Sequence, residues 1–203
     1  MMPAVELLAG ASAVWQFGPV TVWQLPHVPG TRGEPQAREV LAQALGTPPQ
    51  ALPLTRDERQ RPWLIDRFAH FGTGWSHSGG HLLVGLGERV RLGVDLEQQR
   101  PRPRLREVIA RFFHPDEIAW LLGLDEEACQ HWFFRVWCAK EALLKAHGHG
   151  ISFGLHKLSF APTAAGDLAL AWCDPGLGAA SSWQLYEWQA SPTFRAALAF
   201  QVL

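Results

Sequence analysis

The longest regular pattern in the chain is a helical one in its second half. Apolar residues recur at helical spacing from Glu126 to His147, and Gly148 and Gly150 follow as stop signals. Segments rich in β-branched and aromatic residues lie on both sides of this pattern in the sequence. The chain must bury one long helix against sheet material, which indicates an α+β fold.

Shorter patterns set the order of the other elements. Strands are predicted at Ala13–Leu25, Leu82–Leu86, Val90–Glu97, Leu168–Trp172, Trp183–Trp188 and Phe194–Leu203. Further helices are predicted at Gln36–Leu45, Leu105–Phe113 and Pro115–Leu122. Each half of the chain has its own helix and its own strands. We therefore expect two lobes, residues 1–98 and 99–203, joined by the proline- and arginine-rich stretch 100–106.

Composition excludes several classes of protein. The formal net charge of −1 over 203 residues argues against bulk nucleic-acid binding. The three cysteines have no paired spacing, which favours a reduced compartment. No apolar run is long enough to cross a membrane. No positive segment precedes the N-terminal apolar run, and Pro3 and Glu6 interrupt it, so we expect no signal peptide and a cytoplasmic protein.

Two carboxylates lie on one face of the predicted strand Val90–Glu97. Because alternate strand residues share a face, Leu92, Val94 and Leu96 should point to a core, and Asp95 and Glu97 to the other side. Neighbouring carboxylates repel each other unless a cation lies between them, and Mg²⁺ prefers such oxygen ligands. A strand edge with two solvated acids is the alternative.

A stripe of functional side chains runs along the long helix. Trp137, Glu141 and Lys145 follow one another at four-residue spacing, so they lie one above another. The chain has only three lysines among eighteen basic residues, and Lys140 and Lys145 are two of them. Lysine in an arginine-biased chain indicates that a compact point charge is needed. A surface Glu–Lys pair of small energetic value is the alternative.

A glycine-rich segment, 74–80, precedes the strand Leu82–Leu86. We expect a turn there, whose Ser76, His77 and open backbone amides could hold an anion such as phosphate. A merely polar surface loop is the alternative. The pair Ser76–His77 also invites a hydrolase interpretation, but no nucleophile elbow surrounds the serine.

Together these segments resemble the 4′-phosphopantetheinyl transferases, specifically the two-lobed surfactin-synthetase-activator type. The segments that carry the resemblance are Gly74–Ser78, Gly93–Glu97, Phe112–Glu117 and Trp137–Lys145. The resemblance implies two similar α/β lobes related by a pseudo-twofold axis, with the active site in the cleft between them. It also implies a monomer, because half-length relatives must oligomerise to build a comparable cleft.

The resemblance implies roles for individual residues. Asp95, Glu97 and Glu141 match the Mg²⁺ ligands, and Glu141 also matches the base for the attacking hydroxyl. Lys140 and Lys145 match lysines that engage the phosphates of coenzyme A. The remaining matches are contacts with the coenzyme, those of Ser76, His77, Arg38 and Arg61, with His77 at the 3′-phosphate.

The implied reaction moves 4′-phosphopantetheine from coenzyme A to a serine of an apo acyl or peptidyl carrier protein and releases 3′,5′-ADP. Carrier proteins are typically acidic, so the basic stretch Arg100–Arg106 is expected to help dock them. Two departures from the family pattern concern the coenzyme: Gly74 replaces an asparagine and His149 replaces a lysine. The alternatives are a non-catalytic paralogue that binds coenzyme A or a carrier protein, and an unrelated Mg²⁺ phosphohydrolase using Asp95 and Glu97.

Overall fold

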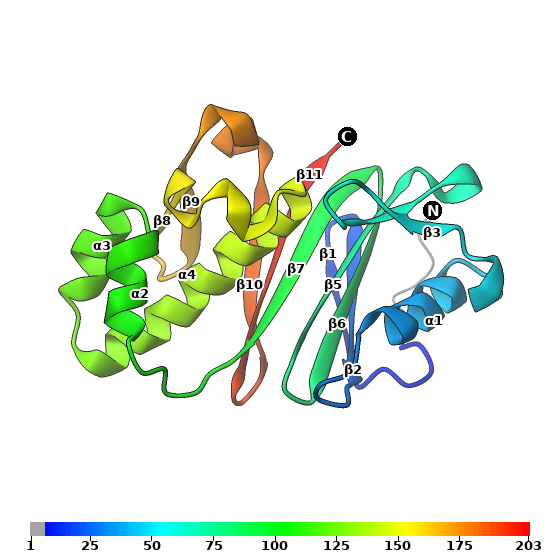
Figure 1. The fold of residues 1–203 in the computed structure, drawn as a ribbon, viewed down its shortest axis with the longest axis horizontal. Helices are drawn as coiled ribbons and strands as arrows, with labels where there is room; N and C mark the ends of the chain where they lie inside the picture. The colour runs from blue at the N-terminus through cyan, green and yellow to red at the C-terminus, as the bar shows by residue number, and fades with distance from the viewer. Residues whose placement is uncertain (1–6) are drawn as a thin grey trace.

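Four layers make up the molecule in the computed structural model, which describes residues 7–203 (Figure 1). Two antiparallel sheets stand side by side in the middle, with helix α1 outside one and helix α4 outside the other. Pro3 and Glu6, which bear on the predicted absence of a leader, lie outside the described residues. Between residues 7 and 203, no helix has both the length and the apolar character needed to span a membrane.

The first sheet has the strand order β1-β2-β6-β5. Its strands are β1 (Ala13–Phe17), β2 (Val20–Pro26), β5 (Phe71–Ser78) and β6 (His81–Glu88). Helix α1 (Glu34–Ala44) buries Ala37, Val40 and Leu41 against the outer face of this sheet. A separate hairpin of β3 (Leu54–Arg56) and β4 (Pro62–Leu64) follows α1 in the chain.

The second sheet has the strand order β10-β11-β7. Its strands are β7 (Val90–Gln98), β10 (Gln184–Ser191) and β11 (Phe194–Val202). The long helix α4 (Glu126–His147) covers its outer face. The remaining elements, α2 (Leu105–Phe112), α3 (Pro115–Leu122), β8 (Leu158–Pro162) and β9 (Leu168–Cys173), extend the core around α4. Short 3₁₀ turns lie at Pro49–Ala51, Asp66–Phe68, Gly150–Phe153, Leu155–Lys157, Pro175–Leu177 and Ala180–Ser182.

An apolar core joins the two sheets. Its members come from β2, β6, β7 and β11: Val20, Val22, Leu83, Val90, Leu92, Val94, Leu96, Phe194, Ala196, Leu198 and Phe200. The predicted core direction of Leu92, Val94 and Leu96 is thereby confirmed, since all three are buried here. Asp95 and Glu97 consequently face the opposite side of β7, toward α4.

Strand β7 also runs alongside β5 of the other sheet. The two backbones lie so close at Gly72 that a Cβ there would overlap the carbonyl oxygen of Val90. Only glycine permits this approach, which brings β5 and β7 together without ladder hydrogen bonds between them. Residues of β5 therefore reach the side chains of β7.

The α+β class predicted from the sequence is confirmed, and the bounds of α3 and α4 agree with the predicted ones. The segment 74–80 differs from its prediction: Gly74–Ser78 belongs to strand β5, and only Gly79 and Gly80 form the turn to β6. The division into lobes at residue 98 stays a proposal. Strand β7 precedes that boundary, yet it pairs along its whole length with β11, which follows it.

Candidate active site at the junction of β5, β7 and α4

The close packing of α4 on β7 depends on Gly93. A Cβ at this position would overlap the carbonyl oxygen of Ala142 and the amide nitrogen of Ala146, and would lie 2.9 Å from Cβ of Lys145. Backbone atoms cannot move aside as the end of a flexible side chain can. Gly93 thus sets the distance between the helix that carries Glu141 and Lys145 and the strand that carries Asp95 and Glu97.

We expect Gly93→Ala to reduce the free energy of unfolding by about 1–3 kcal/mol through overpacking. The chemistry of this site should be impaired as well, because α4 must shift relative to β7. Chemical denaturation measures the first effect. Gly80→Ala is the matched control, since its added Cβ would find its nearest atom 3.8 Å away. Equal stability of the two variants would show that α4 does not need glycine at position 93.

Asp95 lies at the centre of the site and is only 4% exposed. Its Oδ1 accepts hydrogen bonds from Nζ of Lys145 at 2.6 Å and from Oγ of Ser76 at 3.0 Å. Its Oδ2 is buried and has no hydrogen-bond partner within residues 7–203. A buried carboxylate oxygen without a donor is costly unless a cation or water satisfies it.

Glu141 of α4 faces the same cluster. It is buried and has no hydrogen bond or ion pair in the described part of the chain. Burial raises the pKa of its carboxyl group to about 7, and the charges of Asp95 and Glu97 add to this effect while Lys145 opposes it. Burial and Asp95 likewise raise the pKa of Glu97, against the opposing effects of Arg102 and Trp137. The three acids are thus crowded and incompletely neutralised.

These observations fit a divalent cation. The acids offer hard oxygen ligands, and Oδ2 of Asp95 and the carboxylate of Glu141 accept no hydrogen bond from residues 7–203. Positive charge would relieve the mutual repulsion of the three acids. Within the described residues, no three His, Cys, Asp or Glu side chains already stand in ligating geometry around one point. Lys145 instead pairs with Asp95, and this contact raises the pKa of the lysine although burial alone would lower it.

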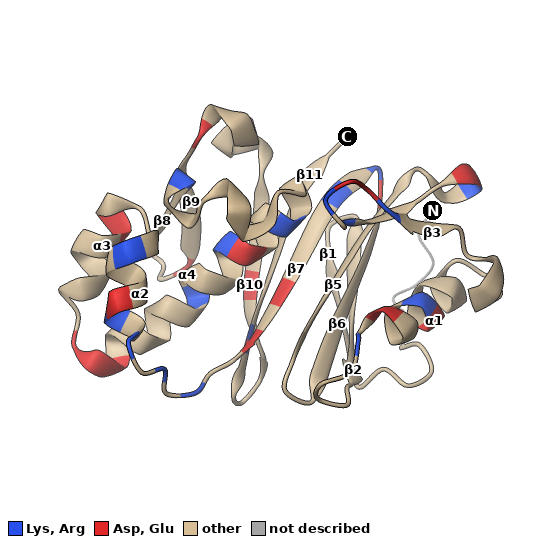
Figure 2. Cartoon of the chain, in the orientation of Figure 1, with Lys and Arg blue, Asp and Glu red and all other residues tan. Residues whose placement is uncertain are grey.

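Positions of both charge signs lie close together at this junction. Figure 2 shows the acidic positions of β7 next to neighbouring acidic and basic positions of α4. Lys145, one turn beyond Glu141 on α4, also donates to Oγ of Ser76 at 3.0 Å. The helical stripe predicted from the sequence therefore faces the strand acids, as the spacing of Glu141 and Lys145 indicates.

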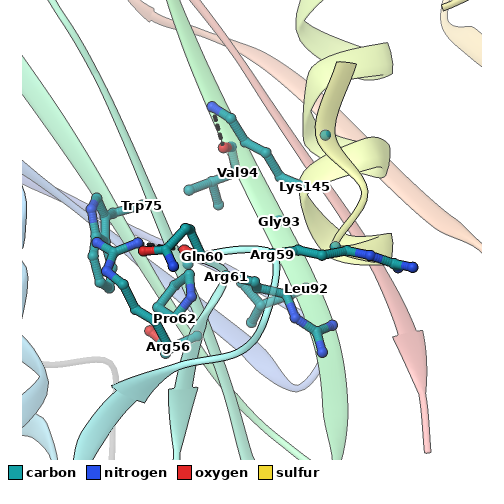
Figure 3. A pocket seen from close by; sticks show the side chains of 14 residues that line it. Arg56, Arg59, Gln60, Arg61, Pro62, Trp75, Leu92, Gly93, Val94 and Lys145 are labelled. Atoms are coloured by element: carbon teal, nitrogen blue, oxygen red, sulfur yellow. Dashed lines mark hydrogen bonds between the residues drawn. The ribbon is translucent and has the colours of Figure 1, made fainter. Parts of the chain in front are cut away.

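A basic pocket of about 220 Å³ adjoins the acidic cluster. Arg56, Arg59 and Arg61 line it from the β3–β4 hairpin, and Lys145 lines it from α4 (Figure 3). Nearby backbone at Gly74, Gly93, Gly148 and Gly150 completes the wall. Four cations around a wall of glycine backbone form a surface that favours a polyanion.

Arg61, a predicted coenzyme contact, lines the basic pocket, and its role stays a prediction. Its Nε donates to Oδ2 of Asp57 at 3.0 Å, and its Nη1 donates to the carbonyl oxygen of Ala146 at 3.2 Å. The arginine thereby attaches the hairpin to the C-terminal turn of α4. Arg56 and Arg59 were not singled out in the sequence, although the run from Arg56 to Arg61 contains three arginines in six residues.

Ser76 and His77 do not act as a pair. As neighbours on strand β5, they point to opposite faces, so Ser76 contacts Asp95 and Lys145 while His77 stacks on His27 at 4.6 Å. One anion therefore cannot lie against both side chains on the same face of β5, and their contacts with the coenzyme stay predictions. Ser76 belongs to the acidic cluster, and the exposed His77 lies beside the α1 side of the sheet.

The structure contradicts the predicted coenzyme contact of Lys140, whereas that of Arg38 stays a prediction. Lys140 is fully buried, pairs with Glu117 at 2.7 Å and donates to the carbonyl oxygens of Leu155 and Leu158. Its three ammonium hydrogens are used inside the fold, so none is available for a phosphate. Arg38 donates to the backbone carbonyl groups of residues 49, 52 and 54 and thus supports that loop.

Comparison with known protein families identifies the class of this chain. A family model described as the 4′-phosphopantetheinyl transferase superfamily matches residues 91–199, more than half of the chain, beginning with β7 and ending in β11. The chain therefore belongs to the 4′-phosphopantetheinyl transferase superfamily.

Individual relatives match over similar parts of the chain. A putative 4′-phosphopantetheinyl transferase of Synechocystis is 39% identical over 60% of this chain and 50% of its own length. The 4′-phosphopantetheinyl transferase HetI of Nostoc is 39% identical over 60% of this chain and 52% of its own. This chain thus spans about half the length of these curated relatives. Among solved structures, a holo-[acyl-carrier-protein] synthase of Thermotoga maritima is 16% identical, with a TM-score of 0.43 over 55% of this chain and 62% of that chain.

Proposed function

We propose that this protein transfers the 4′-phosphopantetheine group of coenzyme A to a serine of apo acyl or peptidyl carrier proteins and releases 3′,5′-ADP. The observation that carries the proposal is one side chain, Lys145, which lines the basic pocket and contacts Asp95 of the acidic cluster. A site for a polyanion and a site for a divalent cation therefore adjoin each other, as transfer from a pyrophosphate requires.

The basic pocket is where we place the phosphates of coenzyme A. Arg56, Arg59 and Arg61 come from one short hairpin and line this space together with Lys145 of α4 (Figure 3). Arginine donors match phosphate oxygens in planar pairs, and lysine supplies a compact charge.

Asp95, Glu97 and Glu141 are the residues that would hold Mg²⁺. The ion would supply positive charge to the pyrophosphate oxygens at which negative charge develops. Oδ2 of Asp95 and the carboxylate of Glu141, neither of which has a hydrogen-bond partner among residues 7–203, support this assignment.

Two side chains of the protein accept the serine proton and stabilise the negative charge that develops during transfer. The serine oxygen of the carrier bonds to the phosphorus next to pantetheine, and the bond from that phosphorus to the bridging oxygen breaks. The electron pair leaves with 3′,5′-ADP, and the serine proton goes to Glu141, which has no competing partner in the described residues. Lys145 stabilises the added negative charge.

Mass spectrometry tests the proposal directly. Incubation with coenzyme A, Mg²⁺ and an apo carrier protein should add one phosphopantetheine group to the carrier. Absence of the adduct with fatty-acid, polyketide and peptide-synthesis carriers would contradict the proposal. Coenzyme A binding in calorimetry without any transfer would instead favour a non-catalytic paralogue.

We expect Arg59→Gln to raise the KM for coenzyme A about tenfold or more, with little change in kcat. Arg59 lines the pocket and has an exposed side chain whose contact within the described chain is a hydrogen bond to Nδ1 of His149 at 2.8 Å. A hydrogen bond to a charged group contributes about 1.5–3 kcal/mol, and about 1.4 kcal/mol is tenfold. Arg32→Gln, an exposed arginine outside the pocket, is the control. An unchanged KM would remove Arg59 from the coenzyme site.

Carrier docking near Arg100–Arg106 remains part of the proposal, in a narrower form. The guanidinium group of Arg102 donates a hydrogen bond to Glu97. That of Arg106 donates to the carbonyl oxygens of Leu122 and Leu124. Arg100, Arg104 and Arg106 are exposed, and of these Arg106 donates to the two carbonyl oxygens just named, so Arg100 and Arg104 are the cations that we assign to docking. A monomer that docks one carrier at a time is the simplest form of this proposal.

The KM for an acidic carrier should therefore rise with ionic strength, from about 0.05 M to about 0.5 M salt, because salt screens exposed charges. A double substitution, Arg100→Glu and Arg104→Glu, should raise this KM at low salt and flatten its salt dependence. Steady-state kinetics with a carrier titration measures both. A KM that does not respond to salt in the unaltered protein would exclude electrostatic docking at this segment.

A further inference from the structure

Both oxygens of Glu97 are held by donors from two different elements. Nε1 of Trp137, on α4, donates to Oε1 at 3.0 Å, and Nη2 of Arg102, in the segment between β7 and α2, donates to Oε2 at 2.9 Å. The arginine side chain is 31% exposed and the glutamate side chain 20% exposed, so the pair is largely shielded from water. The carboxylate is therefore fixed in both position and plane.

Arg102 is itself held by aromatic rings. Its Cζ lies 5.6, 5.4 and 5.5 Å from the ring centroids of Phe133, Phe134 and Trp137. The rings of Phe133 and Trp137 stack on each other at 5.5 Å. Because Trp137 contacts both Arg102 and Glu97, the three side chains form one closed set of contacts.

The geometry points to Arg102 as a positioning residue for Glu97, a role that rests on the proposed function. The arginine fixes the carboxylate orientation and leaves the remaining lone pairs of both oxygens for a cation. A planar guanidinium can stack on the rings and donate sideways at the same time, whereas an ammonium group cannot do so. The sequence offered no local signal for this contact, because residues 100–106 indicated a basic linker and a docking segment but no partner for Arg102 within the chain.

Removing Arg102 should have a signature that general destabilisation cannot produce. Without it, Glu97 loses its fixed orientation, and losses of this kind typically reduce activity about 10- to 100-fold. The local negative charge nevertheless increases, so a divalent cation should bind at least as tightly as before. A simple folding defect would weaken transfer and cation binding together.

The test compares Arg102→Gln with Arg111→Gln. Arg111 is exposed, and its guanidinium also lies over a ring, that of Phe112, but it does not contact Glu97. Three quantities are measured on the full chain: kcat and KM for transfer, the Kd for Mn²⁺ by electron paramagnetic resonance, and the indole N–H resonance of Trp137. That resonance is assigned with Trp137→Phe in ¹⁵N-tryptophan-labelled protein.

We expect Arg102→Gln to lower kcat about 10- to 100-fold, leave or lower the Kd for Mn²⁺, and shift the Trp137 resonance. Arg111→Gln should change none of these. If Arg102→Gln does not fold, Arg102→Lys keeps the charge and the stem over the rings, and should still lower kcat and shift the resonance.

An unshifted Trp137 resonance, or a kcat equal to that of Arg111→Gln, would overturn the inference. A Kd for Mn²⁺ that rises together with a fall in kcat would do the same, since it indicates a structural defect. Failure of the proposed function can be distinguished from failure of this inference, because the unaltered protein would then bind Mn²⁺ without transferring phosphopantetheine. In that case the Mn²⁺ and Trp137 measurements still decide whether Arg102 positions Glu97.

Discussion

Glu141→Gln should reduce phosphopantetheine transfer about 10²- to 10⁴-fold, the range typical of a lost general base. Glutamine has nearly the same shape but can neither accept the serine proton nor contribute negative charge to a cation site. The side chain is buried, carries no hydrogen bond or ion pair within residues 7–203, and lies near two other acids. The carrier-protein mass assay, followed over time, measures the loss.

The same variant should not destabilise the fold. Replacing a carboxylate that is buried and repelled by Asp95 and Glu97 with a neutral amide removes a like-charge interaction, so the Tm should stay the same or rise. A gain in stability with a loss of activity identifies a functional residue. Glu127→Gln, an exposed glutamate in the first turn of α4, is the control and should change neither quantity. Full transfer activity in Glu141→Gln would show that another group accepts the proton.

Lys140→Met should lower the free energy of unfolding by about 3–5 kcal/mol, the usual cost of removing one partner of a buried ion pair. Lys140 and Glu117 are both fully buried, and the substitution leaves Glu117 with a charge but no cation. Glu117 would keep its hydrogen bonds from the amides of Phe160 and His114, which do not neutralise it. Thermal and urea unfolding measure the change.

A second substitution separates the ion pair from the packing of the side chain. Adding Glu117→Gln to Lys140→Met should recover part of the lost stability, because no unpaired charge then remains in the core. Lys157→Met is the control, since Lys157 is partly exposed and its contacts include the ring of Phe153. The KM for coenzyme A should be unchanged in the folded double variant. A raised KM for coenzyme A in that double variant would show that Lys140 contacts the coenzyme, contrary to what its burial indicates.

Local periodicity determined much of this protein from the sequence alone. Alternation along β7 placed Asp95 and Glu97 on one face and the apolar residues Leu92, Val94 and Leu96 on the other. Helical spacing placed Glu141 and Lys145 on one stripe, and stop signals located the end of α4 at His147. These properties depend on backbone geometry that repeats every two or every 3.6 residues, so a single segment contains them.

Periodicity also explains the error over Lys140. Lys145 lies five positions after Lys140 on the helix. At about 100° per residue, the two side chains point in directions roughly 140° apart around the helix axis. One of them can face the strand acids only if the other points elsewhere. Which lysine faced the core and which faced the site depended on where β7 and α3 pack against α4.

The tertiary structure alone decided the contacts between distant segments. Strand β7 pairs with β11, whose residues lie about a hundred positions later in the chain. Because position 93 is glycine, α4 packs close enough to β7 for Lys145 to contact Asp95. Ser76 joins the cluster because Gly72 lets β5 run against β7, and Arg102 joins it because three rings of α4 hold its guanidinium. Such contacts arise from the packing of whole elements against each other, and no pattern within one segment encodes their partners. The sequence determined which acids and which lysine share a face, whereas the packing of β5, β7 and α4 made them one site.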